Sequence, residues 1–137
     1  MSLTNQQIQL VQKSFAKVAL ISAQAADIFY EKLFELDPNL KKLFKGDLNE
    51  QKKMLMATLS TAVGSLTKLD QLVPVLQKLA ERHVGYGVKP EHYTLVGNAL
   101  LRTLKTGLGD DFTDETRDAW IATYRVIADT MKAHAYP

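Results

Sequence analysis

Apolar residues recur at intervals of three and four along almost the whole chain, and this spacing limits the possible folds more than any other feature. Near the N-terminus it is carried by Ile8, Val11, Phe15 and Val18. The same step returns in the stretches 25–34, 55–69, 72–79, 95–104 and 119–131. This period gathers apolar side chains on one face of an α-helix, whereas a half-buried strand needs strict alternation, for which there is no credible run. The sequence therefore predicts an all-α protein.

Side chains that can cap helices mark several of the predicted helix starts. Thr4 and Gln7 have the spacing of a capping box, and Thr113 precedes a helix with an acidic first turn. Ser22 and Asp70 stand before two further periodic stretches, so we expect them to cap helices as well.

The predicted helices differ in length. Asp37-Pro38 ends the second one, and a short corner helix follows from Pro38 to a stop at Gly46. The glycines at 85 and 87 break another helix, and Pro90 opens the next. Six or seven unequal helices without a repeat or a linker fit a fold wrapped around a pocket better than a four-helix bundle.

Length and composition set the class of protein. The 137 residues, 46% of them hydrophobic, suffice for one domain with its own core. The chain has no Cys, which excludes disulfides, Cys-ligated zinc, iron–sulfur clusters and thiol nucleophiles. A net charge of +2 does not suggest a nucleic-acid partner.

The apolar runs and the charged residues bear on where in the cell the protein is found. No apolar run approaches the roughly 20 residues of a membrane span, and the N-terminus does not resemble a signal peptide, so we expect a cytoplasmic protein without a membrane partner. We interpret the charged clusters as solvated faces; they are Lys41, Lys42, Lys45, Lys52 and Lys53, and the acidic stretch 110–118.

The segment 79–97 holds the most suggestive single residue, His83. It lies near the end of an apolar helical run, where an imidazole facing a hydrophobic slot can be the axial ligand of a flat cofactor such as haem. By itself a lone histidine on an apolar face is more often a core residue. Neither His92 nor His134 has a partner at zinc-binding spacing, and we assign both to the surface.

Patterns typical of hydrolases and of nucleotide-binding proteins are not found. Gly64-Ser65 lacks the strand and glycines of a nucleophile elbow, and Gly85-Tyr86-Gly87 follows no predicted strand. Tyr30 and Gln51 occupy positions where the periodicity calls for apolar residues, and buried polar groups need partners. A bound polar ligand would supply them. The apolar side chains that could line a slot beside them are Phe29, Phe34, Phe44, Leu55, Leu79, Val88 and Val96.

Five segments, in this order, carry a resemblance to a known family: FYEKLFELDP, KKLF, EQKKML, HVGYGVKPEHYTLVG and DAW with VIAD behind it. From about Thr4 to about Ala133 the sequence resembles a globin, most closely the single-domain bacterial haemoglobins related to the globin part of flavohaemoglobins. The resemblance implies a globin fold of six to eight helices around a haem pocket, with residues 1–137 as one globin domain. It also implies haem b (iron protoporphyrin IX) as the cofactor.

The resemblance implies a role for eleven side chains. His83 becomes the proximal ligand of the haem iron. Tyr30 and Gln51 become the polar pair on the distal side, with Leu55 as the apolar wall above the iron. The remaining expected haem contacts are Phe34, Phe44, Met54, Leu79, Val88, Tyr93 and Val96.

One departure from the family concerns the proximal side. In flavohaemoglobin-like proteins a glutamate on the last helix joins the proximal histidine and a tyrosine in a hydrogen-bonded set. This sequence keeps the tyrosine, Tyr93, but has Ala135 where the glutamate is expected. The electron-donating strength of His83 is therefore open.

Three functions are compatible with these residues. The first is reversible binding of O₂, and of NO and CO, for oxygen transport or buffering. The alternative is an NO dioxygenase, for which we expect a separate reductase, since the printed chain ends at Pro137 before any reductase domain. The third is a haem-free globin-like module that senses or scaffolds.

Overall fold

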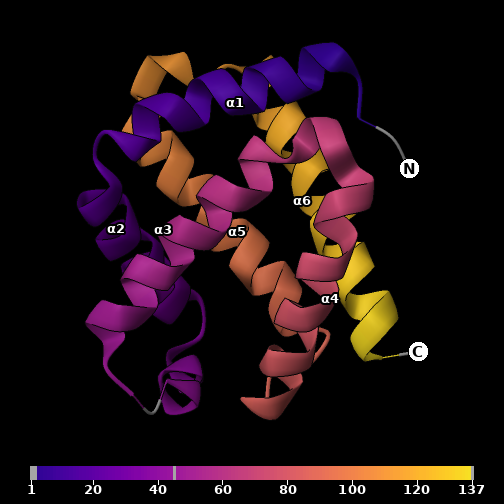
Figure 1. Cartoon of the computed structure of the whole chain (residues 1–137). Coiled ribbons are helices and arrows are strands. Elements are labelled where there is room, and N and C mark those ends of the chain that lie inside the picture. Colours follow the sequence, from indigo (N-terminus) through magenta and orange to yellow (C-terminus); the bar gives the residue numbers. More distant parts are fainter. Residues whose placement is uncertain (1–2, 45, 137) are drawn as a thin grey trace.

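The computed structural model describes residues 3–44 and 46–136, and within them the chain forms six α-helices and three short 3-10 helices (Figure 1). The elements are α1 (Asn5–Ala19), α2 (Ser22–Leu36), η1 (Pro38–Leu43), α3 (Leu48–Gly64), η2 (Leu66–Lys68), α4 (Leu69–Gly85), α5 (His92–Leu108), η3 (Gly109–Asp111) and α6 (Asp114–Ala135). The described residues include no strand, which confirms the all-α prediction. Lys45, one of the clustered lysines, lies outside the described residues.

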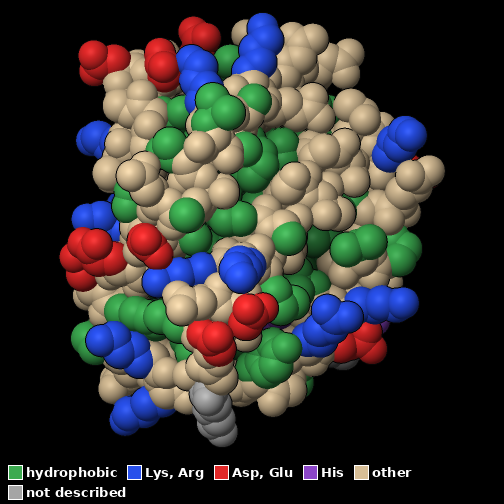
Figure 2. All heavy atoms as spheres, turned by 60° about the vertical axis from the view of Figure 1, so that its left-hand side comes forward, with side chains coloured by type: hydrophobic (Ala, Val, Ile, Leu, Met, Phe, Trp, Pro, Cys, Tyr) green, Lys and Arg blue, Asp and Glu red, His purple; other side chains and the backbone are tan. Residues whose placement is uncertain are grey.

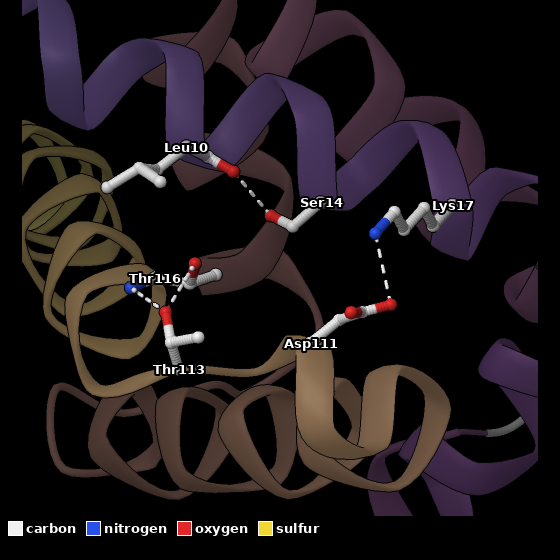
Figure 3. A network of polar contacts seen from close by, with 6 residues as sticks. All are labelled: Leu10, Ser14, Lys17, Asp111, Thr113 and Thr116. Carbon is white, nitrogen blue, oxygen red and sulfur yellow. Dashed lines mark hydrogen bonds and ion pairs between the residues drawn. The ribbon is translucent and has the colours of Figure 1, made fainter.

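Two of the four predicted caps are confirmed. The Thr4 hydroxyl accepts from the Gln7 amide at 3.0 Å and the Gln7 side chain accepts from the Thr4 amide, as a capping box requires. The Thr113 hydroxyl accepts from the amide of Thr116 at 3.2 Å at the start of α6 (Figure 3).

The other two predicted caps are wrong. Ile21 precedes α2 without any side-chain cap, so Ser22 is already a helical residue. Helix α4 begins at Leu69, and Asp70 lies inside its first turn. At both places a turn or a 3-10 segment leads directly into the helix, so the preceding backbone rather than a side-chain acceptor sets the start.

The predicted corner helix is present in a tighter form. It is a 3-10 helix of six residues that ends at Leu43, three residues before the predicted stop. The Asp37 carboxylate accepts from the Asn39 amide at 3.0 Å and fixes its start. Phe44 follows immediately with a non-helical backbone, which turns the chain toward α3.

One region, which we call the closed core, lies where α1 crosses α6 at the top of the view in Figure 1. It consists of Val11 and Phe15 from α1, Leu104 from α5, and Ala119 and Trp120 from α6, all buried. The indole Nε1 of Trp120 donates to the Ser14 hydroxyl at 2.8 Å, and Ser14 in turn donates to the Leu10 carbonyl at 2.7 Å. The polar atoms of this core are thus satisfied within the chain.

Polar contacts at the surface hold the ends of the same helices together. Figure 3 shows Lys17 of α1 reaching Asp111 of η3, an ion pair of 3.0 Å, beside the Thr113 cap of α6. Both charged side chains are exposed, so this pair contributes little stability by itself.

The second region, the cavity end, lies between α4 and the C-terminal half of α6. Its buried apolar side chains are Ala62, Leu72, Leu76, Ala80, Ala128 and Met131. Here α4 packs against α6, while α2 packs against α5, and the two pairs leave a cavity between them.

The surface carries charges of both signs. Figure 2 shows Lys and Arg side chains interspersed with Asp and Glu on the face that contains the left-hand side of Figure 1. Lys52 is paired with Asp27 at 2.9 Å and Lys53 with Glu50 at 3.7 Å, so two of the clustered lysines are ion-pair partners. Among the described residues, no helix combines the length and the apolar character that a membrane crossing requires.

Candidate functional site

A cavity of about 410 Å³ opens between α2 and α3 on one side and α4, α5 and α6 on the other. Its walls are mostly apolar, and its volume lies in the range of small-molecule and cofactor pockets. Ten of the eleven side chains singled out in the sequence line it: Tyr30, Phe44, Gln51, Met54, Leu55, Leu79, His83, Val88, Tyr93 and Val96.

Phe34 is the one member of the set that does not line the cavity. Its ring packs edge-on against Phe44, with the centroids 5.6 Å apart, and Lys41 lies over its face at 5.5 Å. The structure thus places Phe34 behind Phe44, where it supports a lining side chain.

His83 sits in the last turn of α4, held by its own helix. The ring Nδ1 donates to the Leu79 carbonyl at 2.8 Å, because a carbonyl oxygen can only accept. Burial lowers the pKa of His83, and the backbone hydrogen bond opposes this only in part. The neutral ring that results has its lone pair on Nε2, which is the form that binds a metal ion.

Tyr30 and Gln51 stand on another wall of the same cavity. The Tyr30 side chain is only 6% exposed, and its hydroxyl donates to the Gln51 backbone carbonyl over 3.4 Å. That distance is long for a hydroxyl donor, so this contact holds the hydrogen weakly. Burial raises the pKa of Tyr30 to about 12, which keeps the phenol protonated at neutral pH. A second acceptor inside the cavity can therefore recruit this donor.

An aromatic frame fixes the Tyr30 ring. Phe29 meets it edge-on at 5.2 Å between centroids, and Phe44 meets it edge-on at 5.4 Å. The hydroxyl position is thus set by packing rather than by its one long hydrogen bond.

The proximal wall shows what takes the place of the expected glutamate. Ala135 packs among the apolar residues of the cavity end, and the hydroxyl of the next residue, Tyr136, donates to the Val88 carbonyl. The Tyr93 hydroxyl is buried and has no hydrogen-bond partner within the described residues, although its ring lies 6.4 Å from that of His83. His83 therefore bonds to a neutral carbonyl instead of joining a carboxylate network.

A close approach between α5 and α6 sets the position of Tyr93. Gly97 lets the Tyr124 ring lie so near that a Cβ at position 97 would stand 2.7 Å from its Cε2. From there the Tyr124 hydroxyl donates to the Tyr93 carbonyl at 2.6 Å. Gly97 is required here for space, which explains why glycine occurs inside a helix.

The cavity is also lined by polar side chains that the sequence did not assign to the site, among them Arg82 and His92. His92 was assigned to the surface, and Arg82 attracted no interpretation because it belongs to no apolar pattern. Only their sequence neighbours could have indicated that they line the cavity: Arg82 directly precedes His83, and His92 follows a turn that begins at Lys89.

The donor set fits haem better than a metal ion held by the protein alone. Among the described residues, no group of three His, Cys, Asp or Glu side chains could hold a metal ion. What the cavity offers is one imidazole with a free lone pair, apolar walls, and the unpartnered hydroxyl of Tyr93. A flat apolar group that brings its own iron ligands satisfies this arrangement.

Comparisons with known proteins agree with this fit. The family model described as Globin matches residues 27–131. The chain is 40% identical over 105 residues to a flavohemoprotein of Oceanobacillus iheyensis, covering 74% of this chain and 26% of that protein. It is 31% identical over 133 residues to a flavohemoprotein of Bacillus subtilis, covering 94% and 33%. The chain thus spans a quarter to a third of the length of these curated relatives.

Solved structures share the fold along nearly the whole chain. An engineered carbene transferase, a candidate nitric oxide dioxygenase from Rhodothermus marinus, superposes with a TM-score of 0.89 at 26% identity, covering 98% of this chain and 94% of the other. A hexacoordinated haem protein from a tardigrade gives a TM-score of 0.88 at 18% identity, covering 98% and 96%. The second likeness shows the fold alone.

Proposed function

Because the chain belongs to the globin family, we propose that it binds haem b through His83 and binds O₂ reversibly, with NO and CO as further ligands. The observation that supports this most directly is the placement of Tyr30 and Gln51 in one cavity with His83. When bound, haem supplies an iron with one coordination position open to diatomic gases.

His83 and Tyr30, which lie on different walls of the cavity, would have different roles. His83, neutral and oriented by Leu79, would hold the haem iron through its Nε2. Tyr30 would donate a hydrogen bond to a diatomic ligand that carries partial negative charge, which would favour O₂ over CO. The apolar side chains around them, including Leu55 and Phe44, exclude water from the ligand.

Replacing the distal donor tests this proposal. Tyr30→Phe removes a hydrogen bond to a polarised ligand, and we expect the O₂ dissociation rate to rise about 10- to 100-fold, with a much smaller change for CO. Thr61→Val, which removes a hydroxyl from an exposed side chain of α3 away from the cavity, is the control and should change the rate less than about twofold. An unchanged O₂ dissociation rate in Tyr30→Phe would contradict the distal role. Purified protein that takes up no haem would contradict the function itself.

The relatives support a second candidate, an NO dioxygenase. They include proteins named flavohemoprotein and a candidate nitric oxide dioxygenase. The reaction joins NO, O₂ and one electron into nitrate, so it needs a reductant, and we propose a separate reductase as the donor. Sustained NO consumption with a reductase and NAD(P)H, and none without them, would favour this activity over simple O₂ binding. The cytoplasmic location stays a prediction.

A further inference from the structure

The residues that directly follow His83 have little packing of their own. Val84 and Tyr86 are 45% and 52% exposed. Gly87, at a positive φ of 89°, turns the chain so that the Val88 amide donates to the His83 carbonyl at 3.0 Å. This backbone hydrogen bond closes the end of α4, so the position of His83 depends on the position of Val88.

Tyr136 holds this loop from the end of α6. Its backbone amide donates to the Lys132 carbonyl at 2.8 Å, which continues the turn of the helix, and its hydroxyl donates to the Val88 carbonyl. Among the described residues, no other hydrogen bond reaches the loop 86–91 from outside α4 and α5. Through its carbonyl and its amide, Val88 thus connects Tyr136 to the backbone of His83.

The Tyr136 ring supports the same wall of the cavity by packing. It lies edge-on to the Tyr93 ring, with the centroids 6.5 Å apart at 87°, and the Tyr93 ring lies 6.4 Å from the His83 imidazole. The phenol of Tyr136 carries no charge at pH 7. It can therefore fix the groups around His83 in place, but it cannot share negative charge with the imidazole as a carboxylate would.

We propose that Tyr136 is a positioning residue for His83, and that its hydroxyl, through the Val88 carbonyl, fixes the orientation of the imidazole toward the haem iron. The proposal rests on the proposed function, because it takes His83 as the haem ligand. The His83 Nδ1 donates to the neutral Leu79 carbonyl. On this side of the cavity the chain therefore contributes the placement of the imidazole rather than added negative charge.

The experiment separates the hydroxyl of Tyr136 from its ring. Tyr136→Phe removes the donor to Val88 and keeps the ring, whereas Tyr136→Ala removes both. Thr130→Val, which removes a hydroxyl that bonds within α6 and does not line the cavity, is the control. Three quantities are measured: hydrogen exchange of the Val88 amide in the haem-free protein, the iron–histidine stretching band of the ferrous protein in resonance Raman spectra, and the rate at which haem passes to an excess of a haem acceptor.

In Tyr136→Phe we expect the Val88 amide to exchange, and haem to leave, about three- to tenfold faster than in the parent protein, the size of one neutral hydrogen bond. The iron–histidine band should broaden, because His83 adopts a wider range of orientations. Exchange of the Val11 amide in the closed core should not change. Tyr136→Ala should show larger effects than Tyr136→Phe, and Thr130→Val should match the parent protein.

Three outcomes in Tyr136→Phe would overturn the positioning role. Equally faster exchange at Val88 and Val11 would mean that the substitution loosens the whole fold. An unchanged iron–histidine band, even with faster exchange or faster haem loss, would mean that Tyr136 holds the loop without positioning His83. Parental values in all three measurements, whatever Tyr136→Ala shows, would mean that the hydroxyl has no role.

In each of these cases haem still binds the parent protein, so the proposed function stands. A parent protein that binds no haem would overturn the proposed function, and the positioning of an iron ligand would be overturned with it.

Discussion

Two positions of α6, one turn apart, lie in different surroundings. Trp120 in its first half is 2% exposed and its indole nitrogen is paired with Ser14 of α1. Thr123, one turn further, is fully buried, yet its hydroxyl has no partner within the described residues and it lines the cavity. Trp120 also touches the cavity, so it marks where the closed core ends.

The comparison distinguishes a region whose packing and hydrogen bonds are satisfied within the chain from a region that leaves space and polar groups for a ligand. In the closed core, apolar burial and internal hydrogen bonds account for the packing. Around the cavity, the hydroxyls of Tyr93 and Thr123 have no partner within the described residues and that of Tyr30 is weakly engaged, and a ligand in the cavity would offset the cost of burying them. The predictions below test this division by stability.

The largest expected effect comes from truncating a closed-core side chain. Leu104→Ala should lower the free energy of unfolding by about 2–5 kcal/mol, with or without haem, because it opens a void among side chains that are fully packed. Leu79→Ala should cost less than about 1.5 kcal/mol without haem, since Leu79 already faces the cavity, and more with haem bound. Urea unfolding of both forms measures this. If Leu104→Ala and Leu79→Ala lowered the free energy of unfolding equally in the haem-free protein, the proposed difference between the two regions would be wrong.

A smaller effect is expected where α5 meets α6. Gly97→Ala should destabilise the protein by about 1–3 kcal/mol, because the new methyl group displaces the Tyr124 ring. Since Tyr124 holds the Tyr93 carbonyl, haem retention should fall as well. The thermal midpoint and the rate of haem loss report the two effects. Gly64→Ala, where a Cβ meets nothing within 4 Å, is the control and should be neutral or stabilising.

The smallest expected effect is a pH dependence that arises from two tyrosines lining the cavity. Burial raises the pKa of Tyr30 and of Tyr93 to about 12, and both line the cavity. The unfolded chain loses these protons near pH 10. The folded protein therefore holds more protons between pH 10 and pH 12, and its stability should fall as the pH rises through that window.

Tyr30→Phe isolates one of these groups. It should reduce the alkaline loss by about 1–2 kcal/mol between pH 9 and pH 12, measured by urea unfolding at each pH. Leu104→Ala should shift the whole curve downward without changing its slope, because no titrating group is involved. An unchanged alkaline slope in Tyr30→Phe would mean that the Tyr30 phenol is not held in its protonated form.

The sequence predicts the fold well where the determinants are local. The capping box at Thr4 and the N-cap at Thr113 depend on residues three positions apart, and both are confirmed. Ser22 and Asp70 have the right chemistry for caps, but the turns before them determine where α2 and α4 begin. The corner after Asp37 winds as a 3-10 helix for a related reason, since a six-residue segment between two long helices is shaped by its connections.

For the site, the resemblance to globins points to ten residues that do line one cavity, a grouping that no local pattern contains. Phe34 shares their apolar character but lies behind Phe44, a difference that only packing decides. Arg82 and His92 have no periodicity to reveal them. Arg82 lies in the last turn of α4 and His92 begins α5, on either side of the loop in which Gly87 adopts a positive φ of 89°.

The contact between Tyr136 and the Val88 carbonyl has a practical consequence for the measurements above. This hydrogen bond connects the end of α6 to the loop between α4 and α5, which follows His83. Helix α1, in contrast, begins beside the closed core. We expect a purification tag or fluorescent label placed directly after α6 to disturb this hydrogen bond and the loop that it contacts. The same tag placed ahead of α1 would lie beside the closed core, away from the loop that follows His83. The N-terminal side is therefore the better place for tags and for surface immobilisation.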